Sequence, residues 1–352
     1  MRFGAMGDMV LLIPMLKALE QRYGRPCELV SSGPWTQPLM ERVPACGPVH
    51  LLTSRRTPYY FNPSQWRLVN HLRHRPPGPV YVCEPDEKPL SLLHRGGIGD
   101  EWICSLRNLP RQPGEHIVEH ALRLARQTPP ALQGLAEFDA PADIHPNARP
   151  VLNAADRADC TAWLQQRGIT SQQLVLIQPG NKKTMKPGSR RRRSNVKYWP
   201  EAHWAEVISG VCELLPGAQA ILCGTAAEQS LAEDIASQVT ARQGRLVIAT
   251  GELPIHRLLA LQERAHSMIS IDTGPAHSAA AMGCPEVVLF TRHNRCESDF
   301  YAPLPTTAPV KILQPAEAAA DPGLSSITPS AVLLAWHELA ASNWRKADGM
   351  PG

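Results

Sequence analysis

The sequence predicts an α/β protein made of two doubly wound domains that face a central cleft. Short apolar runs alternate with amphipathic helical stretches along most of the 352 residues, and this alternation is typical of parallel sheets covered by helices. A proline-rich segment without periodicity, residues 128–150, divides the alternation into two halves. The chain is long enough for each half to bury its own core.

The first domain is expected to span residues 1–150 and to include the linker at 128–150. Its helices and strands follow from apolar spacing, with Gly7-Asp8 as a helix-start signal. Arg2-Phe3 leaves little room for a first strand, because strands usually have about five residues. Either this strand is very short, or the natural start lies upstream of Met1. The predicted elements are helices at 9–23 and 116–125, and strands at 28–31, 49–52 and 80–83.

The second domain is expected to span residues 151–327. A final helix at 328–345 and a disordered tail at 346–352 follow it. The same alternation predicts strands at 174–178, 220–223, 246–249, 268–271 and 286–290, and helices at 200–215, 228–238, 255–265 and 275–282.

The Gly4-x-x-Gly7-Asp8 turn lies where the first predicted strand ends. Glycines at this place allow the backbone to approach a ligand. The spacing differs from the G-x-G-x-x-G of dinucleotide-binding proteins, which argues against a nicotinamide-dependent dehydrogenase. Asp8 is a candidate general base, although simple capping of the following helix explains it equally well.

An Asp272-Thr273-Gly274-Pro275 turn joins a buried strand to a helix of small residues that contains His277. Backbone N–H groups at a helix start, next to the carboxyl end of a parallel strand, bind phosphorylated ligands. A capped turn without a ligand is the alternative, since Asp272 and Thr273 are good capping residues.

Three other predicted strand ends in this domain also carry residues suited to a ligand. Lys182 and Lys197 are placed to neutralise a diphosphate leaving group, whereas Tyr198 and Trp199 are expected in the core. The candidate residues at these strand ends are Gln178, Gly180, Asn181, Lys182, Gly224, Glu228, Gly251 and Leu253.

Positive charge is concentrated in one window. Eight basic residues and no acids lie between Lys182 and Lys197. The net charge of the chain is +4, so this window carries +8 and the remainder of the chain carries −4. An anionic partner near the arginines of this window is one interpretation, and a solvated insertion is the other. The arginines are Arg190, Arg191, Arg192 and Arg193.

The nine cysteines include no Cys-x-x-Cys pair, so we expect buried reduced thiols and neither a zinc site nor a disulfide framework. No apolar run reaches the roughly 18 to 20 residues that span a bilayer, and no export signal is recognised. These features predict a cytoplasmic protein.

Three motifs together resemble glycosyltransferase family 9, the heptosyltransferases. Met6-Gly7-Asp8 before an apolar helix, Lys197-Tyr198-Trp199-Pro200 with Trp204, and Asp272-Thr273-Gly274-Pro275-Ala276-His277 are similar to family motifs in order and spacing. The helix around Glu115–His120 is similar too. The resemblance is strongest over residues 174–300.

The resemblance implies a GT-B fold and transfer of heptose from an ADP-activated donor to the inner core of lipopolysaccharide. It implies an inverting reaction that needs no metal and no cofactor, an anionic glycolipid acceptor, peripheral contact with the inner membrane and no nucleic-acid partner. Asp8 would activate the acceptor, Lys197 would hold the phosphates, Glu228 the ribose and Leu253 the adenine edge, while residues 272–274 would hold the sugar and diphosphate.

Two departures from the family pattern stand out: the nearly missing first strand and the basic insertion at 184–195. We expect the insertion to contact acceptor or lipid phosphates. The alternatives are a related GT-B transferase with another nucleotide sugar or a polysaccharide or protein acceptor, and a non-catalytic paralogue that binds a nucleotide. A two-domain solute-binding protein would need an export signal.

Overall fold

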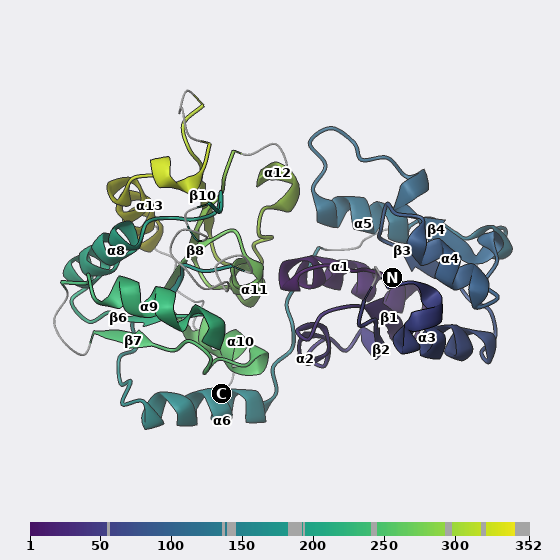
Figure 1. The fold of residues 1–352 in the computed structure, drawn as a ribbon, viewed down its shortest axis with the longest axis horizontal. Helices are drawn as coiled ribbons and strands as arrows, with labels where there is room; N and C mark the ends of the chain where they lie inside the picture. Colours follow the sequence, from purple (N-terminus) through teal and green to yellow (C-terminus); the bar gives the residue numbers. More distant parts are fainter. Residues whose placement is uncertain are drawn as a thin grey trace. The chain divides into compact units, whose positions relative to one another are not determined.

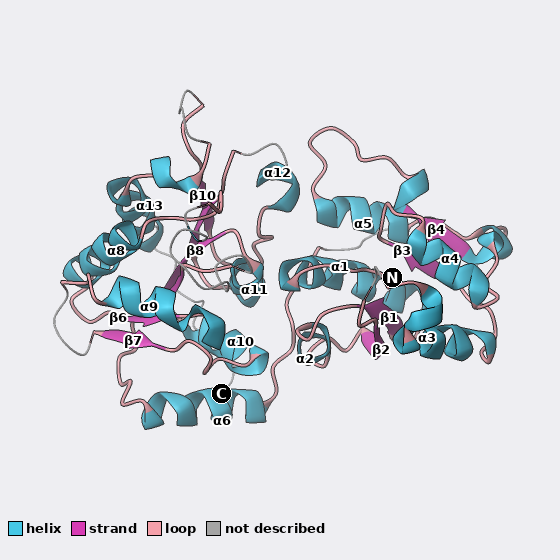
Figure 2. Cartoon of the chain, viewed as in Figure 1, coloured by secondary structure: helices cyan, strands magenta, loops and turns pink. Residues whose placement is uncertain are grey.

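Parallel strands alternate with helices along the chain (Figure 1, Figure 2). The computed structural model describes residues 1–54, 57–135, 138, 146–181, 192, 194–240, 245–292, 298–317 and 322–341. The chain divides into two units, Met1–Val151 and Leu152–Gly352, each with its own hydrophobic core.

The N-terminal unit contains two pairs of parallel strands, β1 with β2 and β3 with β4. The start of the chain lies between these pairs. The Arg2 N–H donates to the Val30 carbonyl at 3.0 Å, and the Cys83 N–H donates to the Met1 carbonyl at 2.9 Å. The elements are α1 (Met6–Tyr23), β1 (Cys27–Ser31), α2 (Thr36–Met40), β2 (Cys46–Leu51), α3 (Pro63–Arg73), β3 (Val80–Val82), α4 (Lys88–Arg95), β4 (Ile103–Ser105) and α5 (Ile117–Ala125).

Residues 1–3 therefore occupy the position of a central strand. Its hydrogen bonds connect the two strand pairs in the order β2, β1, residues 1–3, β3, β4. Phe3 is only 6% exposed and belongs to the core of this unit. Burial of one aromatic side chain helps to hold a segment that is too short to be a regular strand.

The C-terminal unit contains six parallel strands in the order β10–β9–β8–β5–β6–β7. The strand order reverses between β5 and β8, which is the switch point where sheets of this kind bind ligands. The elements are α6 (Ala154–Gln166), β5 (Leu174–Gln178), α8 (Glu201–Leu214), β6 (Gln219–Leu222), α9 (Gln229–Ala236), β7 (Leu246–Ile248), α10 (Ile255–Arg264), β8 (Ser267–Ile271), α11 (Gly274–Met282), β9 (Glu286–Leu289), α12 (Ser298–Tyr301), β10 (Val310–Leu313) and α13 (Pro329–Ala341).

Helices cover both faces of this sheet. Val287 and Leu289 of β9 belong to a core cluster with residues of α8, α9 and α13. The intervening Val288 packs in a second cluster with Phe290 and with Ala276 of α11. Because side chains alternate between faces along a strand, a strand buried on both faces reads as a continuous apolar run.

The structure corrects the prediction at the start of the first helix. The sequence predicts a Gly4-x-x-Gly7-Asp8 turn ahead of a helix at 9–23, but α1 already begins at Met6. Gly7 is buried inside its first turn, and Asp8 is the third helical residue. Asp8 is therefore a residue of the helix and not of a turn before it.

Several elements have no counterpart in the prediction: α2, α3, α4, α6, α12, β4 and β10. Most are short, and some interrupt their apolar pattern with proline or charge. The signal for α3 is local, because the Asn62 side chain caps it and Pro63 stands at its first position. The predicted tail at 346–352 lies outside the described residues.

All cysteines among the described residues are free thiols, and six of the eight are buried. Within the same part of the chain, none of the helices combines the length and the apolar character needed to cross a membrane.

Candidate functional site

The candidate residues of the C-terminal unit follow four neighbouring strands. Gln178 ends β5, and Gly224, Gly251 and Asp272 follow β6, β7 and β8. Since the strands are parallel and lie side by side, their carboxyl ends form one edge of the sheet. The sequence-predicted residues are therefore brought to a common edge at the switch point between β5 and β8.

An ion pair lies at the centre of this edge. The Lys197 ammonium donates a hydrogen bond to the Asp272 carboxylate, and its Nζ also lies 3.2 Å from the Asp272 carbonyl oxygen. On the other side of the carboxylate, His277 Nε2 lies 3.7 Å from Oδ1. Lys197 from the loop before α8 and His277 from α11 thus meet on Asp272.

The electrostatics of Asp272 follow from these neighbours. Burial by itself raises the pKa of the carboxyl group, but the adjacent His277 and the positive charge of Lys197 outweigh burial and lower the pKa below its ordinary value of 3.8. Asp272 is therefore ionised near neutral pH. A ligand phosphate that approaches Lys197 must share this cation with the carboxylate.

The start of α11 supports a ligand more than a capped turn. Thr273 occupies the N-cap position, but its side chain makes no capping hydrogen bond. Its Oγ1 is buried without a hydrogen-bond partner, and so are His277 Nδ1 and Ser270 Oγ. Buried polar atoms are usually satisfied by protein, water or a ligand, so this end of β8 is suited to receive one.

Ser270 is a residue that sequence reasoning missed. It is fully buried in β8 and lies opposite Gln178 in β5. Thr291, just after β9, likewise has a buried hydroxyl without a partner in the structure. The sequence signal for Ser270 is a hydroxyl residue inside the apolar run Met268–Ile271.

The loop that carries Lys197 is held by two anchors. Trp199 is 1% exposed, donates from its indole N–H to the Ile327 carbonyl at 2.9 Å and packs edge-on against Trp204. The predicted core position of Trp199 is thereby confirmed. The second anchor is Asn195, whose Oδ1 accepts from the Lys197 N–H at 3.2 Å and whose Nδ2 donates to Asn181 at 3.2 Å. Asn195 was not among the predicted site residues.

The loops after β6 and β7 pack tightly together. Gly251 has a left-handed backbone (φ 79°), and a Cβ there would lie 3.0 Å from the Cβ of Ala226. Glu228 is buried and accepts hydrogen bonds from the Thr225 N–H and hydroxyl at 2.9 and 3.0 Å. In the structure Glu228 therefore caps its own turn, beside the strand end where the resemblance implies ribose binding. Leu253 follows at the same edge and is half-buried.

The basic window is only partly described. Arg192 is 6% exposed and forms ion pairs with Asp234 and Glu201. This differs from the exposed anion-binding arginine that the sequence predicts, because the two carboxylates already neutralise its charge. Lys182 and Arg190, Arg191 and Arg193 lie outside the described residues.

Asp8 belongs to the N-terminal unit and is fixed by its own neighbours. Oδ1 lies 2.5 Å from Arg2 Nη2, and Oδ2 accepts from the Ala5 N–H at 2.7 Å. A Cβ at Gly4 would lie 2.4 Å from Oδ2. Gly4 is thus required for close approach of the backbone to this carboxylate, which keeps 23% of its side chain exposed.

Comparison with known proteins places these features in a family. The model of glycosyltransferase family 9 (heptosyltransferase) matches residues 94–317, more than half of the chain. No curated protein sequence matches.

Solved structures match nearly the whole chain. E. coli ADP-heptose LPS heptosyltransferase II has a TM-score of 0.71 at 19% identity and covers 97% of this chain and 98% of its own. A family 9 glycosyltransferase from Veillonella parvula DSM 2008 has a TM-score of 0.72 at 17% identity, and the match covers 96% of this chain and 95% of that protein. E. coli heptosyltransferase WaaC with ADP has a TM-score of 0.66 at 17% identity, and the match covers 96% of this chain and 100% of that protein. The fold is therefore GT-B, and the chain is a glycosyltransferase that belongs to glycosyltransferase family 9.

Proposed function

We propose that this enzyme moves a heptose from an ADP-heptose donor to the inner core of lipopolysaccharide, with inversion and without a metal ion. The observation that carries the proposal is the Lys197–Asp272 pair beside the uncapped start of α11. A fixed cation and the positive end of the α11 helix dipole stabilise the charge that develops on a departing diphosphate. The matched structures include a heptosyltransferase with ADP.

The proposed reaction is a single displacement. Asp8 takes the proton from the acceptor hydroxyl, and the acceptor oxygen forms a bond to the anomeric carbon of the heptose. The bond from that carbon to the diphosphate breaks, and ADP leaves with the electron pair. Lys197 stays near the phosphates, so a side chain supplies the positive charge that the leaving group needs.

The remaining residues are assigned to parts of the donor. Gln178 and Gly180, at the end of β5, are assigned to contacts with the sugar or the diphosphate. Gly251 and Leu253 are assigned to an apolar edge that contacts adenine. Glu228 is assigned to the ribose, which requires a hydroxyl group to exchange with its capping bonds to Thr225.

Calorimetry with ADP, UDP, GDP and their sugars tests the donor. Tighter binding of ADP than of UDP or GDP is the expected result. Transfer to a lipopolysaccharide core acceptor, followed by NMR of the product, tests inversion of the anomeric centre, and activity in EDTA tests metal independence. Preference for another nucleotide would favour the related GT-B transferase, and ADP binding without transfer would favour the non-catalytic paralogue.

We also propose that the enzyme works in the cytoplasm, in peripheral contact with the inner membrane. Tyr60 and Phe61 are 68% and 77% exposed in the N-terminal unit, and Trp66 of α3 is 46% exposed. The Arg95 guanidinium lies 4.8 Å from the ring centre of Tyr59 and 6.0 Å from that of Tyr60. Exposed aromatic rings beside a cation suit the interface of an anionic bilayer.

Flotation with vesicles that contain anionic lipid tests the contact. Replacement of Tyr60 and Phe61 by Ser is expected to reduce flotation, whereas the same change at the exposed Leu214 of the other unit serves as control. Charge reversal of Arg190, Arg191 and Arg193, which leaves the buried Arg192 in place, tests the contribution of the basic window. Unchanged flotation in both variants would contradict the membrane contact.

A further inference from the structure

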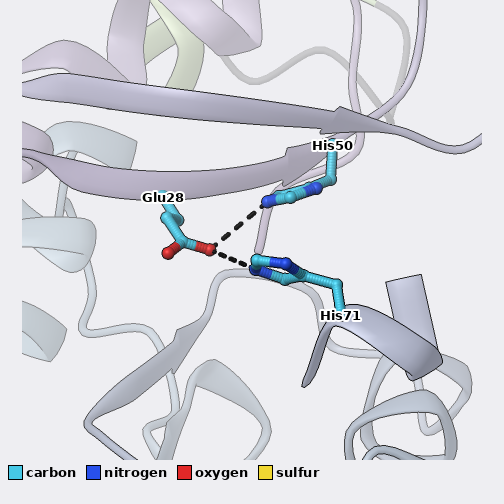
Figure 3. A group of neighbouring side chains, drawn as sticks. All are labelled: Glu28, His50 and His71. Atoms are coloured by element: carbon cyan, nitrogen blue, oxygen red, sulfur yellow. Dashed lines mark hydrogen bonds and ion pairs between the residues drawn. The ribbon is translucent and has the colours of Figure 1, made fainter. Parts of the chain in front are cut away.

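Three side chains of the N-terminal unit that the proposed reaction does not use converge on one point (Figure 3). They are Glu28 of β1, His50 of β2 and His71 of α3. The Oε2 atom of Glu28 lies 3.3 Å from His50 Nε2 and 2.9 Å from His71 Nε2. The three atoms that can bind a metal all lie within 4.8 Å of one another.

The fold brings these side chains together by register and packing. Val30 of β1 pairs with His50 of β2, so Glu28, two residues before Val30, lies on the same sheet face as His50. Helix α3 packs on that face, because Leu68 and Leu72 share a core cluster with Val30. His71 lies between these two leucines in the helix and therefore reaches the edge of the same face.

Two of the three separations between the ligand atoms match a tetrahedral metal site. With metal–ligand bonds of about 2.0–2.1 Å, neighbouring ligand atoms of a tetrahedron lie about 3.3 Å apart. The distances from Glu28 Oε2 to the two imidazole nitrogens, 3.3 and 2.9 Å, are close to this value. Small side-chain rotations suffice to seat a cation, because all three groups are partly exposed.

The donor set selects the kind of metal. Two imidazole nitrogens and one carboxylate oxygen suit zinc and its neighbours among the divalent transition metals. Magnesium and calcium prefer sites made of oxygen ligands. Three protein ligands also leave a fourth coordination position for water or an anion.

A pocket borders the cluster. It has a volume of about 250 Å³, and its lining includes Glu28, His50 and His71 together with Arg25 and Arg75. Arg75 Nη1 lies 2.8 Å from Oε2 of Glu28. Hydrogen bonds from a second layer commonly orient a ligating carboxylate, and the same guanidinium suits an anion bound to the metal.

We propose that Glu28, His50 and His71 bind one zinc-type divalent ion whose fourth position opens into this pocket. Each neutral imidazole then carries its proton on Nδ1 and gives the Nε2 lone pair to the metal. The bound ion joins β1, β2 and α3, so it stabilises the N-terminal unit. This site is separate from the residues assigned to the reaction, and its test does not depend on the substrate.

Titration of the metal-stripped full chain with Zn²⁺, in competition with a chromogenic chelator, tests the proposal. We expect one tight site per chain and a higher Tm with Zn²⁺. Co²⁺ is expected to give the intense visible absorption of a tetrahedral site. Substitutions of outer-shell partners cost about 10- to 100-fold in metal affinity, so H50A/H71A is expected to lose at least as much.

Matched variants separate this site from other zinc ligands. The control H74A/H94A removes two exposed histidines of the same unit that lie outside the cluster, and it is expected to keep full affinity. Glu28→Gln, which preserves side-chain size, is also expected to weaken binding. It tests the site if the histidine variant fails to fold.

Two results would overturn the proposal. One is the absence of stoichiometric Zn²⁺ binding by the folded wild-type chain, which would mean that the cluster is an ion-pair group only. The other is binding that survives both H50A/H71A and Glu28→Gln, which would assign the metal to other ligands such as the cysteines.

Discussion

The Lys197–Asp272 pair joins two residues 75 positions apart at the edge of one sheet. Their side chains are 24% and 11% exposed, so each group is partly removed from water. A half-buried charge is costly without its partner. The pair therefore links stability to the chemistry proposed at this edge.

A double-mutant cycle tests this coupling. Lys197→Ala and Asp272→Ala are each expected to lower the free energy of unfolding, and the double variant is expected to lose less than the sum. The expected coupling is about 0.5–3 kcal/mol, as for other contacting residues, and urea denaturation measures it. Strictly additive losses would show that the two side chains do not stabilise each other.

Asp8 is a second residue whose role follows from its immediate contacts. Asp8→Asn keeps an oxygen that can accept from the Ala5 N–H, so the fold is expected to persist. Loss of a general base is expected to lower kcat by about 100- to 10,000-fold, measured as ADP release with acceptor present.

Two measurements control the Asp8 variant. Glu20→Gln changes an acid at the far end of the same helix and is expected to leave kcat unchanged. The affinity of Asp8→Asn for ADP is expected to match the wild type, because the residues assigned to the nucleotide belong to the C-terminal unit. Full activity of Asp8→Asn would disprove its role as base.

At the scale of elements, β9 carries an unusual residue at its first position. Glu286 is fully buried, and neither carboxyl oxygen has a hydrogen-bond partner in the structure. Burial raises the pKa of this carboxyl group well above its ordinary value of 4.5. Glu286 is therefore neutral in the folded protein under conditions where it is ionised in the unfolded chain.

This difference has a definite sign. Below pH 4.5 both states hold the proton, and Glu286 causes no pH dependence. Above pH 4.5 the unfolded chain releases the proton and the folded one keeps it, so stability falls as pH rises toward the folded pKa. The slope reaches at most about 1.4 kcal/mol per pH unit.

Glu286→Gln is expected to remove this loss and to be more stable than the wild type at pH 7–8. Urea denaturation midpoints from pH 4 to 8 provide the measurement. Glu233→Gln, an exposed change on α9, is expected to leave the profile unaltered. An unchanged pH slope in Glu286→Gln would mean that Glu286 is ionised in the fold.

For the whole molecule, the division into two units separates the proposed roles. Asp8 and the Glu28–His50–His71 cluster belong to residues 1–151, whereas Lys197, Asp272 and α11 belong to residues 152–352. Each unit has its own core, so each can respond to a ligand separately.

Hydrogen exchange is expected to show this separation. Addition of ADP should protect the amides of β5, β8 and the first turn of α11, because ligands that bind only the native state stabilise the region they contact. Zn²⁺ should protect β1, β2 and α3. Protection of the same amides by both ligands would contradict two independent sites.

Much of this architecture could be predicted from local signals. The strand at 174–178 matches β5 in full, and the helix expected at 255–265 matches α10 except for its last residue. Hydrophobic period and helix-start residues depend on near neighbours in the chain. The Asp272–His277 turn and the Lys197 motif could be found for the same reason, since their residue types are meaningful at short spacing.

The sequence by itself determined two α/β units and the strand ends where polar residues gather, because periodicity and turn chemistry are local properties. Only the tertiary structure decided how residues 1–3 complete a sheet, that Arg192 is neutralised by two carboxylates, and that Glu28, His50 and His71 meet. These features depend on strand register and helix packing, which bring together side chains that no spacing along the chain relates.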